Sequence, residues 1–358
     1  MTKQNEIGLP GRRRFIAGAA GATVLAAPVG AALAAGKPAG LTLAYPTRSG
    51  ATWPMWIAKR ASIYEKYGID AKLVFGVHPA GVAMLVSGEA QGINSGLDQV
   101  IPALVRDPSL VMTHSMLNKG NFALVARKEF DSVKALKGKR ISIGRLGDPP
   151  YFYTVELLRK YGLAPNDVQW VSTGTDAASR AAMLLGGQID AALLTAPSYF
   201  KLETQGLKVL TELPDHEDIY VCTVFLHKQA YFSQQRGMAE RLIKAHAEAI
   251  KRFYDDKAFA VSTFKEFDPP ESEADISRVY DIYVKRNVLD RIPLISKAAL
   301  QATVERLAEQ TPAVRSLDLR RVVDNSLVLK LAKEGWFEQL FGAAVREEQE
   351  RKIAGALA

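Results

Sequence analysis

The sequence predicts an α/β protein of two lobes, each with a mainly parallel sheet flanked by helices, and a helical C-terminal part. Three observations support this. Short apolar or β-branched runs alternate with amphipathic segments from residue 41 to about residue 225, which is the pattern of βα units. A similar stretch of ten residues occurs twice, at 84–93 and 183–192. From residue 230 onward, long amphipathic segments of helical period replace the strand patterns.

The first half of the α/β region begins with a strand at residues 41–45. A loop of small and turn-forming residues, 46–52, leads to a helix at 53–67, which Gly68 ends as a left-handed cap. A second strand follows at 69–75. The same reasoning predicts helices at 81–86 and 97–105, and strands at 92–94, 110–116 and 122–126.

The second half repeats this order. Residues 136–144 form a turn and a strand, 149–161 a helix that Gly162 caps, 168–171 a strand, 176–185 a helix and 189–194 a strand. The segment 221–226 is predicted to be a strand that returns from the second lobe. Further helices are predicted at 238–254, 273–286 and 297–309, and the charged segment 346–352 is expected to be a frayed helix or tail.

The first 34 residues have the features of an export signal. Three arginines at 12–14 precede a run of small and apolar residues, and the triplet Ala-Leu-Ala at 32–34 predicts cleavage after Ala34. The arginine pair followed by Phe15 and Ile16 resembles the twin-arginine signal, which exports folded proteins. An ordinary export signal and an uncleaved anchor are the alternatives, although Pro28 and several glycines interrupt the apolar run. The expected location is the periplasm.

The composition is that of a globular protein: 48% of the residues are hydrophobic and 23% are charged. The mature chain of roughly 320 residues exceeds the size at which a single core stops growing, about 250–300 residues, which favours two lobes. The net charge is +8, and basic residues are interleaved with acidic ones. This pattern gives little support to a nucleic-acid partner or a membrane-surface role.

Three stretches carry a resemblance to a known family. They are residues 53–59 with 67–70, the two turns at 87–89 and 187–191, and residues 136–139 followed by a strand, Gly147 and a helix ending at 161–163. In order and spacing over residues 41–225, the sequence resembles the periplasmic solute-binding proteins of ATP-driven importers, in the nitrate, sulfonate and taurine group. These are periplasmic binding proteins of type II.

The resemblance implies two lobes joined by two strand crossovers, which we place near residues 125–128 and 222–225. Lobe 1 would then comprise 35–124 and 226–345, lobe 2 would comprise 125–225, and 346–358 would be a tail. It also implies a monomeric receptor that captures a small organic anion, a carboxylate or sulfonate, and delivers it to an ABC-type permease and ATPase complex. No cofactor and no metal are expected.

The candidate ligand site lies in five loops that follow predicted strands. In open α/β sheets, ligands bind beyond the carboxyl ends of the strands, where helix N-termini offer N–H groups and a partial positive charge. The candidate residues are Tyr45, Arg48, Ser49, Trp53, Asn94, Ser95, Arg145, Gly147, Asp148, Tyr151, Thr173, Thr175 and Thr195.

These residue types favour an organic anion. The guanidinium groups of Arg48 and Arg145 match a planar anion, and aromatic side chains such as Tyr45, Trp53 and Tyr151 suit an apolar body. Asp148 either caps a helix or, facing the cleft, would select a cationic or zwitterionic ligand. The alternatives are that the hydroxyl residues only cap helices and that Trp53 only packs at a helix start.

Enzyme signatures are weak in this sequence. The five histidines show no metal-ligand spacing, and there is no nucleophile elbow, phosphate-binding loop or dinucleotide fingerprint. The single Cys222 lies in an apolar stretch, which favours a core residue over a nucleophile. The pyrimidine synthase of thiamin biosynthesis shares the implied fold, but its cysteine-rich iron-binding segment is absent here. An exported metal- or cofactor-dependent enzyme is the alternative function, and a sensor or a receptor of another importer class is a third.

Overall fold

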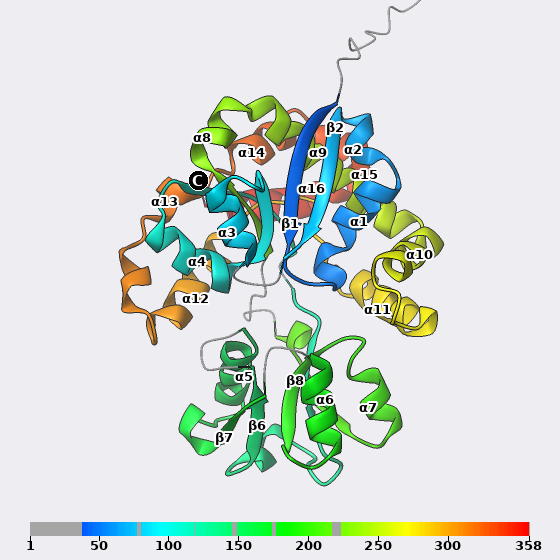
Figure 1. Ribbon diagram of the computed structural model, residues 1–358, viewed down its shortest axis with the longest axis vertical. Coiled ribbons are helices and arrows are strands. Elements are labelled where there is room, and N and C mark those ends of the chain that lie inside the picture. The colour runs from blue at the N-terminus through cyan, green and yellow to red at the C-terminus, as the bar shows by residue number, and fades with distance from the viewer. Residues whose placement is uncertain are drawn as a thin grey trace, which may run out of the picture. The chain divides into compact units, whose positions relative to one another are not determined.

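The computed structural model describes residues 38–357 except 77–79, 118, 145–148, 174–176 and 217–222. This part of the chain contains two five-stranded sheets, each flanked by helices (Figure 1). The predicted α/β fold class with two sheets is therefore confirmed. Cys222 and the export signal lie outside the described residues.

The sheet of lobe 1 has the strand order β2-β1-β3-β10-β4. Strand β1 runs parallel to β2 and β3, and β10 is antiparallel to both β3 and β4. Four strands thus share one direction, as a mainly parallel sheet requires. The bounds are Ala39–Tyr45 for β1, Ile69–Phe75 for β2, Gly92–Gly96 for β3, Leu110–Leu117 for β4 and Thr223–Lys228 for β10.

The sheet of lobe 2 has the order β7-β6-β8-β5-β9, which is the same topology. Strand β6 is parallel to β7 and β8, and β5 is antiparallel to β8 and β9. In each sheet the fourth strand in this order, β10 or β5, therefore runs antiparallel to the other four strands. The bounds are Phe122–Ala126 for β5, Arg140–Ile143 for β6, Gln169–Ser172 for β7, Ala191–Thr195 for β8 and Lys208–Glu212 for β9.

The sequence repeat at 84–93 and 183–192 corresponds to a structural repeat. In each copy a helix end leads through a glycine of positive φ, Gly88 at +86° or Gly187 at +71°, into the third strand of its sheet. Three residues after each glycine, a side-chain oxygen accepts a backbone N–H from the neighbouring strand at 2.9 Å. Gln91 accepts from Thr42 in lobe 1, and Asp190 accepts from Arg140 in lobe 2.

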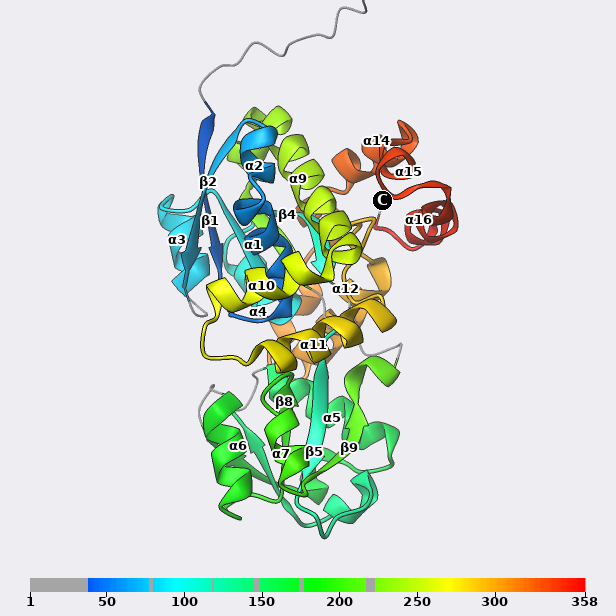
Figure 2. The ribbon, with the colours of Figure 1, turned by 90° about the vertical axis from the view of Figure 1, so that its right-hand side faces the viewer.

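Each predicted helix is present, although the one at the start of lobe 1 is divided, and α7, α8, α10, α13, α14 and α15 were not predicted. The predicted helix at 53–67 is two helices, α1 and α2, because Ser62 adopts a left-handed φ of +53° between them. Helix α1 packs against α9 and α10 (Figure 2). The bounds are α1 Trp53–Arg60, α2 Ile63–Lys66, α3 Ala80–Ser87, α4 Leu97–Arg106, α5 Pro149–Lys160, α6 Ala177–Leu185, α7 Phe200–Thr204, α8 Gln229–Gln234, α9 Arg236–Asp255, α10 Lys257–Phe267, α11 Glu273–Lys285, α12 Lys297–Ala308, α13 Leu319–Val322, α14 Ser326–Lys333, α15 Trp336–Phe341 and α16 Arg346–Ala354.

The helices of the described ranges are all too short or too polar to cross a bilayer. The chain first passes from one sheet to the other between β4 and β5, and it returns between β9 and β10. Strand β5 therefore belongs wholly to lobe 2, whereas the expected boundary at 124/125 divides it. The apolar pattern of β5 does not reveal which sheet the strand joins.

The C-terminal segment expected as a tail is helix α16, and it is held against lobe 1. Lys352 of this helix forms an ion pair of 2.5 Å with the buried Asp290. The side-chain amide of Asn325 donates to the Leu357 carbonyl at 2.9 Å. These contacts hold the segment because they pair it with buried polar groups of lobe 1.

A chain of buried polar side chains runs through the core of lobe 1. The Tyr64 hydroxyl lies 2.8 Å from His246 Nε2, His246 Nδ1 lies 3.0 Å from His114 Nε2, and His114 Nδ1 lies 3.0 Å from the Thr113 hydroxyl. When both imidazole rings are neutral, each of these three contacts can be a hydrogen bond with one proton between its two atoms. Burial lowers the pKa of His246 to about 3 and also lowers that of His114, so both rings are neutral at pH 7.

Candidate functional site

The carboxyl ends of β1, β2 and β3 form one edge of the lobe 1 sheet because these three strands are parallel. Tyr45 ends β1 and is the register partner of Phe75, which ends β2. Their rings lie 5.7 Å apart. Residues 94–96 end β3 beside them. The predicted loops of lobe 1 therefore meet at the expected edge of the sheet.

A cation and an aromatic surface lie together at this edge. The guanidinium of Arg48, on the loop after β1, lies 4.7 Å from the centre of the Phe75 ring, and Phe75 is 41% exposed. Arg48 is close enough to Asp268 to oppose the rise in the pKa of that carboxyl caused by burial. Phe75 was not among the predicted site residues, although an aromatic at the end of a parallel strand is the signal that could have identified it.

The loop that carries Arg48 is tightly held. The Ser49 and Thr47 hydroxyls lie 3.0 Å apart, and the Thr52 hydroxyl donates to the Thr47 carbonyl at 2.8 Å. A Cβ at Gly50 would lie 2.3 Å from the Tyr283 hydroxyl, so only glycine allows the backbone to approach α11 this closely. The arginine and serine therefore project from a fixed turn.

A small pocket opens beside these residues, with a volume of about 10 Å³. That is room for one group the size of a water molecule. It brings together three of the predicted site residues, Tyr45, Asn94 and Ser95, with the first turn of α3. The lining residues are Ala44, Tyr45, Pro46, Gly81, Val82, Ile93, Asn94 and Ser95.

Asn94, which lines this pocket, carries a buried acceptor. Its side chain is 2% exposed, and its Nδ2 donates to the Ala51 carbonyl at 3.3 Å. Its Oδ1 has no hydrogen-bond partner among the described residues. A buried acceptor without a partner costs about 1–3 kcal/mol, so this atom is suited to meet a donor from outside the chain.

Trp53 lies in the core of lobe 1 and contributes nothing to this edge. Its side chain is 0% exposed, and its indole N–H donates to the Ala260 carbonyl at 2.8 Å. The rings of Phe253 and Phe264 pack edge-on against it at 5.0 and 4.9 Å. Trp53 therefore has no exposed surface for a ligand. It packs in the core at the start of a helix, which was the alternative to ligand contact.

The lobe 2 part of the predicted site is only partly described. Tyr151, in the first turn of α5, is half-buried with its ring 5.0 Å from that of Trp170. Thr195 ends β8 opposite Phe122. The Thr173 hydroxyl lies 2.6 Å from the Ser142 hydroxyl and donates to a β6 carbonyl. This side chain therefore links the end of β6 to the residue that follows β7. Four candidates lie outside the described residues: Arg145, Gly147, Asp148 and Thr175.

Asn121 is a further polar residue at the edge of lobe 2 that sequence reasoning missed. It precedes β5, its carbonyl accepts the Ala196 N–H just beyond β8, and it is 5% exposed. Neither atom of its side-chain amide has a partner among residues with described positions. An asparagine between two strands is typical of a turn, so no local pattern indicated its burial.

A buried ionic network joins the two lobes next to this site. Asp98, in the first turn of α4, accepts the Tyr153 hydroxyl of lobe 2 at 2.7 Å and Arg306 Nη2 of α12 at 2.7 Å. Arg306 also donates to Glu156 of lobe 2 at 2.9 Å. Burial would lower the pKa of Arg306, but the Asp98, Tyr153 and Glu156 charges raise it above its ordinary value, so the guanidinium stays charged.

Asp98 changes what the start of α4 can bind. A helix N-terminus carries a partial positive charge that favours an anion. Here the carboxylate of Asp98 already lies in the first turn, and Arg306 neutralises it. One of the five expected anion-binding loops is therefore occupied by the protein's own carboxylate.

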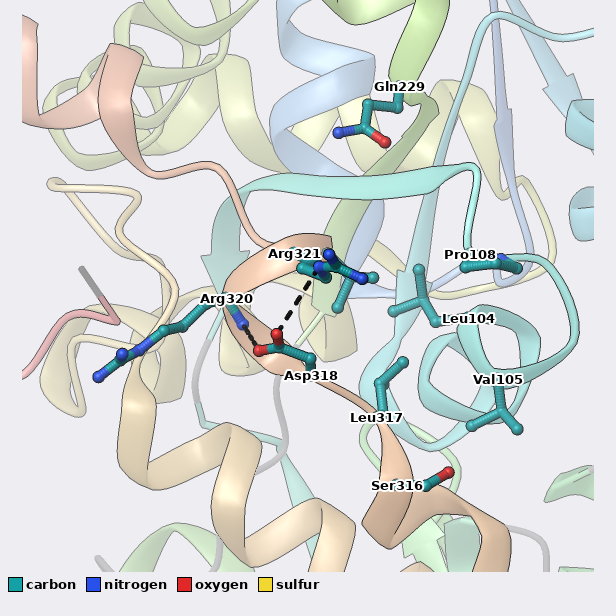
Figure 3. A pocket seen from close by; sticks show the side chains of 10 residues that line it. Leu104, Val105, Pro108, Gln229, Ser316, Leu317, Asp318, Arg320 and Arg321 are labelled. Atoms are coloured by element: carbon teal, nitrogen blue, oxygen red, sulfur yellow. Dashed lines mark hydrogen bonds and ion pairs between the residues drawn. The ribbon is translucent and has the colours of Figure 1, made fainter.

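A larger groove of about 580 Å³ lies elsewhere on lobe 1 (Figure 3). It runs between the end of α4, at Leu104 and Val105, and the segment 316–322. Gln229 also lines the groove, and it follows the last residue of β10. Because β10 is antiparallel to β4, the end of β10 lies beside the first residue of β4. The groove is thus at the amino ends of the parallel strands, opposite the candidate site.

The described ranges contain no cluster of three or more side chains able to hold a metal ion. The site that the described residues assemble is a cationic and aromatic edge with a small polar pocket.

A family model described as NMT1/THI5 like matches residues 51–258, which is more than half of the chain. The chain belongs to the NMT1/THI5-like family. The matched range of this NMT1/THI5-like chain covers all of lobe 2 and the lobe 1 strands β2, β3, β4 and β10. No curated protein matches the chain.

Solved structures share the fold of this NMT1/THI5-like chain at low identity. The periplasmic aliphatic sulphonate binding protein SsuA from Escherichia coli is 17% identical, with a TM-score of 0.67 over 80% of this chain and 92% of that one. The alkanesulfonate-binding protein SsuA from Xanthomonas axonopodis pv. citri, bound to MOPS, is 19% identical, with a TM-score of 0.65 over 82% and 100%. The predicted resemblance to periplasmic solute-binding proteins is therefore confirmed for the family and the fold.

An enzyme also has this fold. The desulfurization enzyme DSZB is 17% identical to the chain, with a TM-score of 0.57 over 82% of this chain and 99% of that one. The fold alone therefore does not separate binding from catalysis.

Proposed function

We propose that the protein is an extracytoplasmic solute-binding receptor that captures a small organic anion, a carboxylate or sulfonate, and delivers it to an ABC-type permease and ATPase complex. The observation that carries the proposal is the guanidinium of Arg48 over the exposed ring of Phe75 at the carboxyl edge of the lobe 1 sheet. A fixed cation next to an apolar surface suits an anion with an apolar body. The names of the sulfonate-binding proteins that share the fold support the same ligand class.

The proposed site extends beyond the described contacts. Lobe 1 contributes Tyr45, Arg48, Phe75, Asn94 and Ser95 around the pocket. From lobe 2, the sequence offers a second guanidinium, a glycine and hydroxyl groups in the corresponding loops: Arg145, Gly147, Tyr151, Thr175 and Thr195. Asp148 belongs to the same loop, and its carboxylate would select a zwitterion if it faces the ligand.

The proposal places the mature protein in the periplasm as a monomer. The arginine cluster and the small-residue triplet of residues 1–34 support export, with the twin-arginine route as the specific expectation. The periplasmic proteins that share the fold support the same location.

An enzyme of the same fold is a second candidate because DSZB is one. The two functions make different predictions for the same experiment. A receptor returns its bound anion unchanged after prolonged incubation, whereas an enzyme releases a product that chromatography of the supernatant detects.

The test is a thermal-shift screen of the purified mature protein against small carboxylates, sulfonates and neutral sugars. Anions with an apolar body should raise the melting temperature, since a ligand at 100 times its Kd stabilises by about 2.7 kcal/mol. Replacing Arg48 by Ala should weaken the best ligand at least tenfold. Arg320→Ala is the matched control, because Arg320 is an exposed arginine of the groove on the opposite edge. Stabilisation by sugars alone, or equal affinity in the two variants, would contradict the proposal.

A further inference from the structure

The pocket beside Tyr45 carries an inference about the ligand that deepens the proposed function and rests on it. The orientation of the Asn94 amide is fixed, because the Ala51 carbonyl only accepts hydrogen bonds and the atom 3.3 Å from it must be Nδ2. The oxygen Oδ1 is therefore the free acceptor of a residue that lines the pocket. It is buried and has no partner among the described residues.

The start of a helix also lines the pocket. Gly81 and Val82 line it in the first turn of α3, which begins at Ala80. The first N–H groups of a helix have no partner inside the helix, and they carry its partial positive charge. The pocket thus combines one acceptor oxygen with a helix start of donor character.

The size of the pocket limits the group that can enter. About 10 Å³ accommodates one heavy atom with its hydrogens, and no more. A carboxylate or sulfonate oxygen would meet the helix start favourably, but the Asn94 oxygen would repel it. An ammonium group would donate to Asn94, yet the positive end of α3 would oppose it, and it cannot accept. A hydroxyl group does both, since it donates one hydrogen bond and accepts others.

We propose that this pocket is the subsite for a hydroxyl group of the ligand, with Asn94 as the residue that determines specificity for a hydroxylated organic anion. The hydroxyl donates to Asn94 Oδ1 and accepts from the first turn of α3. The charged group of the same ligand then lies at the Arg48 side of the edge, where the exposed Phe75 ring contacts the carbon skeleton.

The experiment uses ligands that differ only at the proposed contact. The probes are matched sets of small acids in unsubstituted, hydroxyl and amino form: propanoate, lactate and alanine, and ethanesulfonate, 2-hydroxyethanesulfonate and 2-aminoethanesulfonate, extended to longer chains. Affinities are measured by calorimetry on the mature protein. The hydroxyl member of the best set should bind at least tenfold more tightly than both others, because a site built to pair with a hydroxyl rejects the analogue that lacks it.

The variants Asn94→Leu and Asn94→Ala complete a double-mutant cycle. Both remove the acceptor and also the bond to the Ala51 carbonyl, so the affinity for every member can fall. The readout is therefore the ratio of affinities within a set, and the preference for the hydroxyl member over the unsubstituted acid should fall below about threefold. Urea unfolding of each variant is the control for folding, and the smaller alanine serves if leucine does not fit.

The outcomes separate this inference from the proposed function. If unsubstituted acids bind as tightly as the hydroxylated ones, or if Asn94→Ala retains the preference, a water molecule fills the pocket and the inference fails alone. If the amino member binds best, a cationic group occupies the pocket and the inference also fails. If no acid of any set binds, the proposed function as an anion receptor is contradicted, and this inference fails together with it.

Discussion

Arg306 is expected to hold the two lobes together through its buried ion pairs with Asp98 and Glu156. Replacing it by Met keeps most of the side-chain volume but removes the charge that pairs with Asp98 and Glu156. Asp98, which is 4% exposed, would retain the Tyr153 hydroxyl as its side-chain partner among the described residues. Its carboxylate would then be a nearly uncompensated buried charge.

The size of this effect follows from the burial of the pair. Removing one partner of a buried ion pair costs about 3–5 kcal/mol, because the remaining charge stays desolvated. This is a large share of the roughly 5–15 kcal/mol that separates folded from unfolded states. Since the Arg306 and Asp98 side chains are only 4% and 2% exposed, added salt should screen the pair little.

Urea unfolding of the mature protein measures this loss, and the chain provides a matched control. Arg159 of α5 pairs with Glu309 after α12, so it joins the same two elements, but both side chains are about half exposed at 47% and 51%. Arg159→Met should therefore cost about 0–1 kcal/mol, and this cost should shrink in high salt. If Arg306→Met costs no more than Arg159→Met, the network does not hold the lobes and the reasoning is refuted.

Two further predictions concern the core of lobe 1. Burial lowers the pKa of His227 to about 4 and that of His246 to about 3, so the unfolded chain, whose histidines titrate near 6.5, binds more protons in acid. The free energy of unfolding should have its full value above pH 6.5 and should fall at lower pH, by about 2 kcal/mol for each histidine at pH 5. Urea unfolding at pH 7 and pH 5 measures this difference. An unchanged midpoint would refute the prediction. Trp53→Phe should cost about 1–3 kcal/mol, because it removes the indole hydrogen bond to Ala260 and leaves a gap in the core, yet leave ligand affinity unchanged in calorimetry. A loss of affinity without a loss of stability would instead return Trp53 to the ligand site.

Much of the fold could be predicted from the sequence because it depends on local periodicity. The alternation of strands and helices between residues 41 and 225 is a property of neighbouring residues, and so is the glycine that ends a helix. The repeat around Gly88 and Gly187 was visible because the two lobes use the same helix end at the same place.

The candidate site could be predicted only in its location. Loops at the carboxyl ends of parallel strands follow from topology, which places Tyr45, Asn94 and Ser95 together. Which side chains face the ligand depends on contacts across long separations. Trp53 is buried because Ala260, 207 residues further along the chain, accepts its N–H, and no local pattern shows that.

The ionic network was unpredictable for the same reason. Asp98 and Arg306 are 208 residues apart, and each alone reads as a helix residue facing solvent. The C-terminal helix was underestimated because its charged sequence, rich in glutamate and arginine, suggested a solvated segment. Lys352 finds a buried partner in Asp290 only once the lobe is assembled.

The position of β10 between β3 and β4 constrains the order in which the chain can fold during synthesis. Lobe 2 is a single continuous segment, so it can close as soon as β9 leaves the ribosome. Lobe 1 cannot, since β3 and β4 have no strand between them until β10 is made about 100 residues after β4. Until then both strands expose hydrogen-bonding edges that invite wrong partners. In a ribosome-bound chain that ends shortly after lobe 2, lobe 2 should therefore be folded. Lobe 1 should still be incomplete and should depend on chaperones.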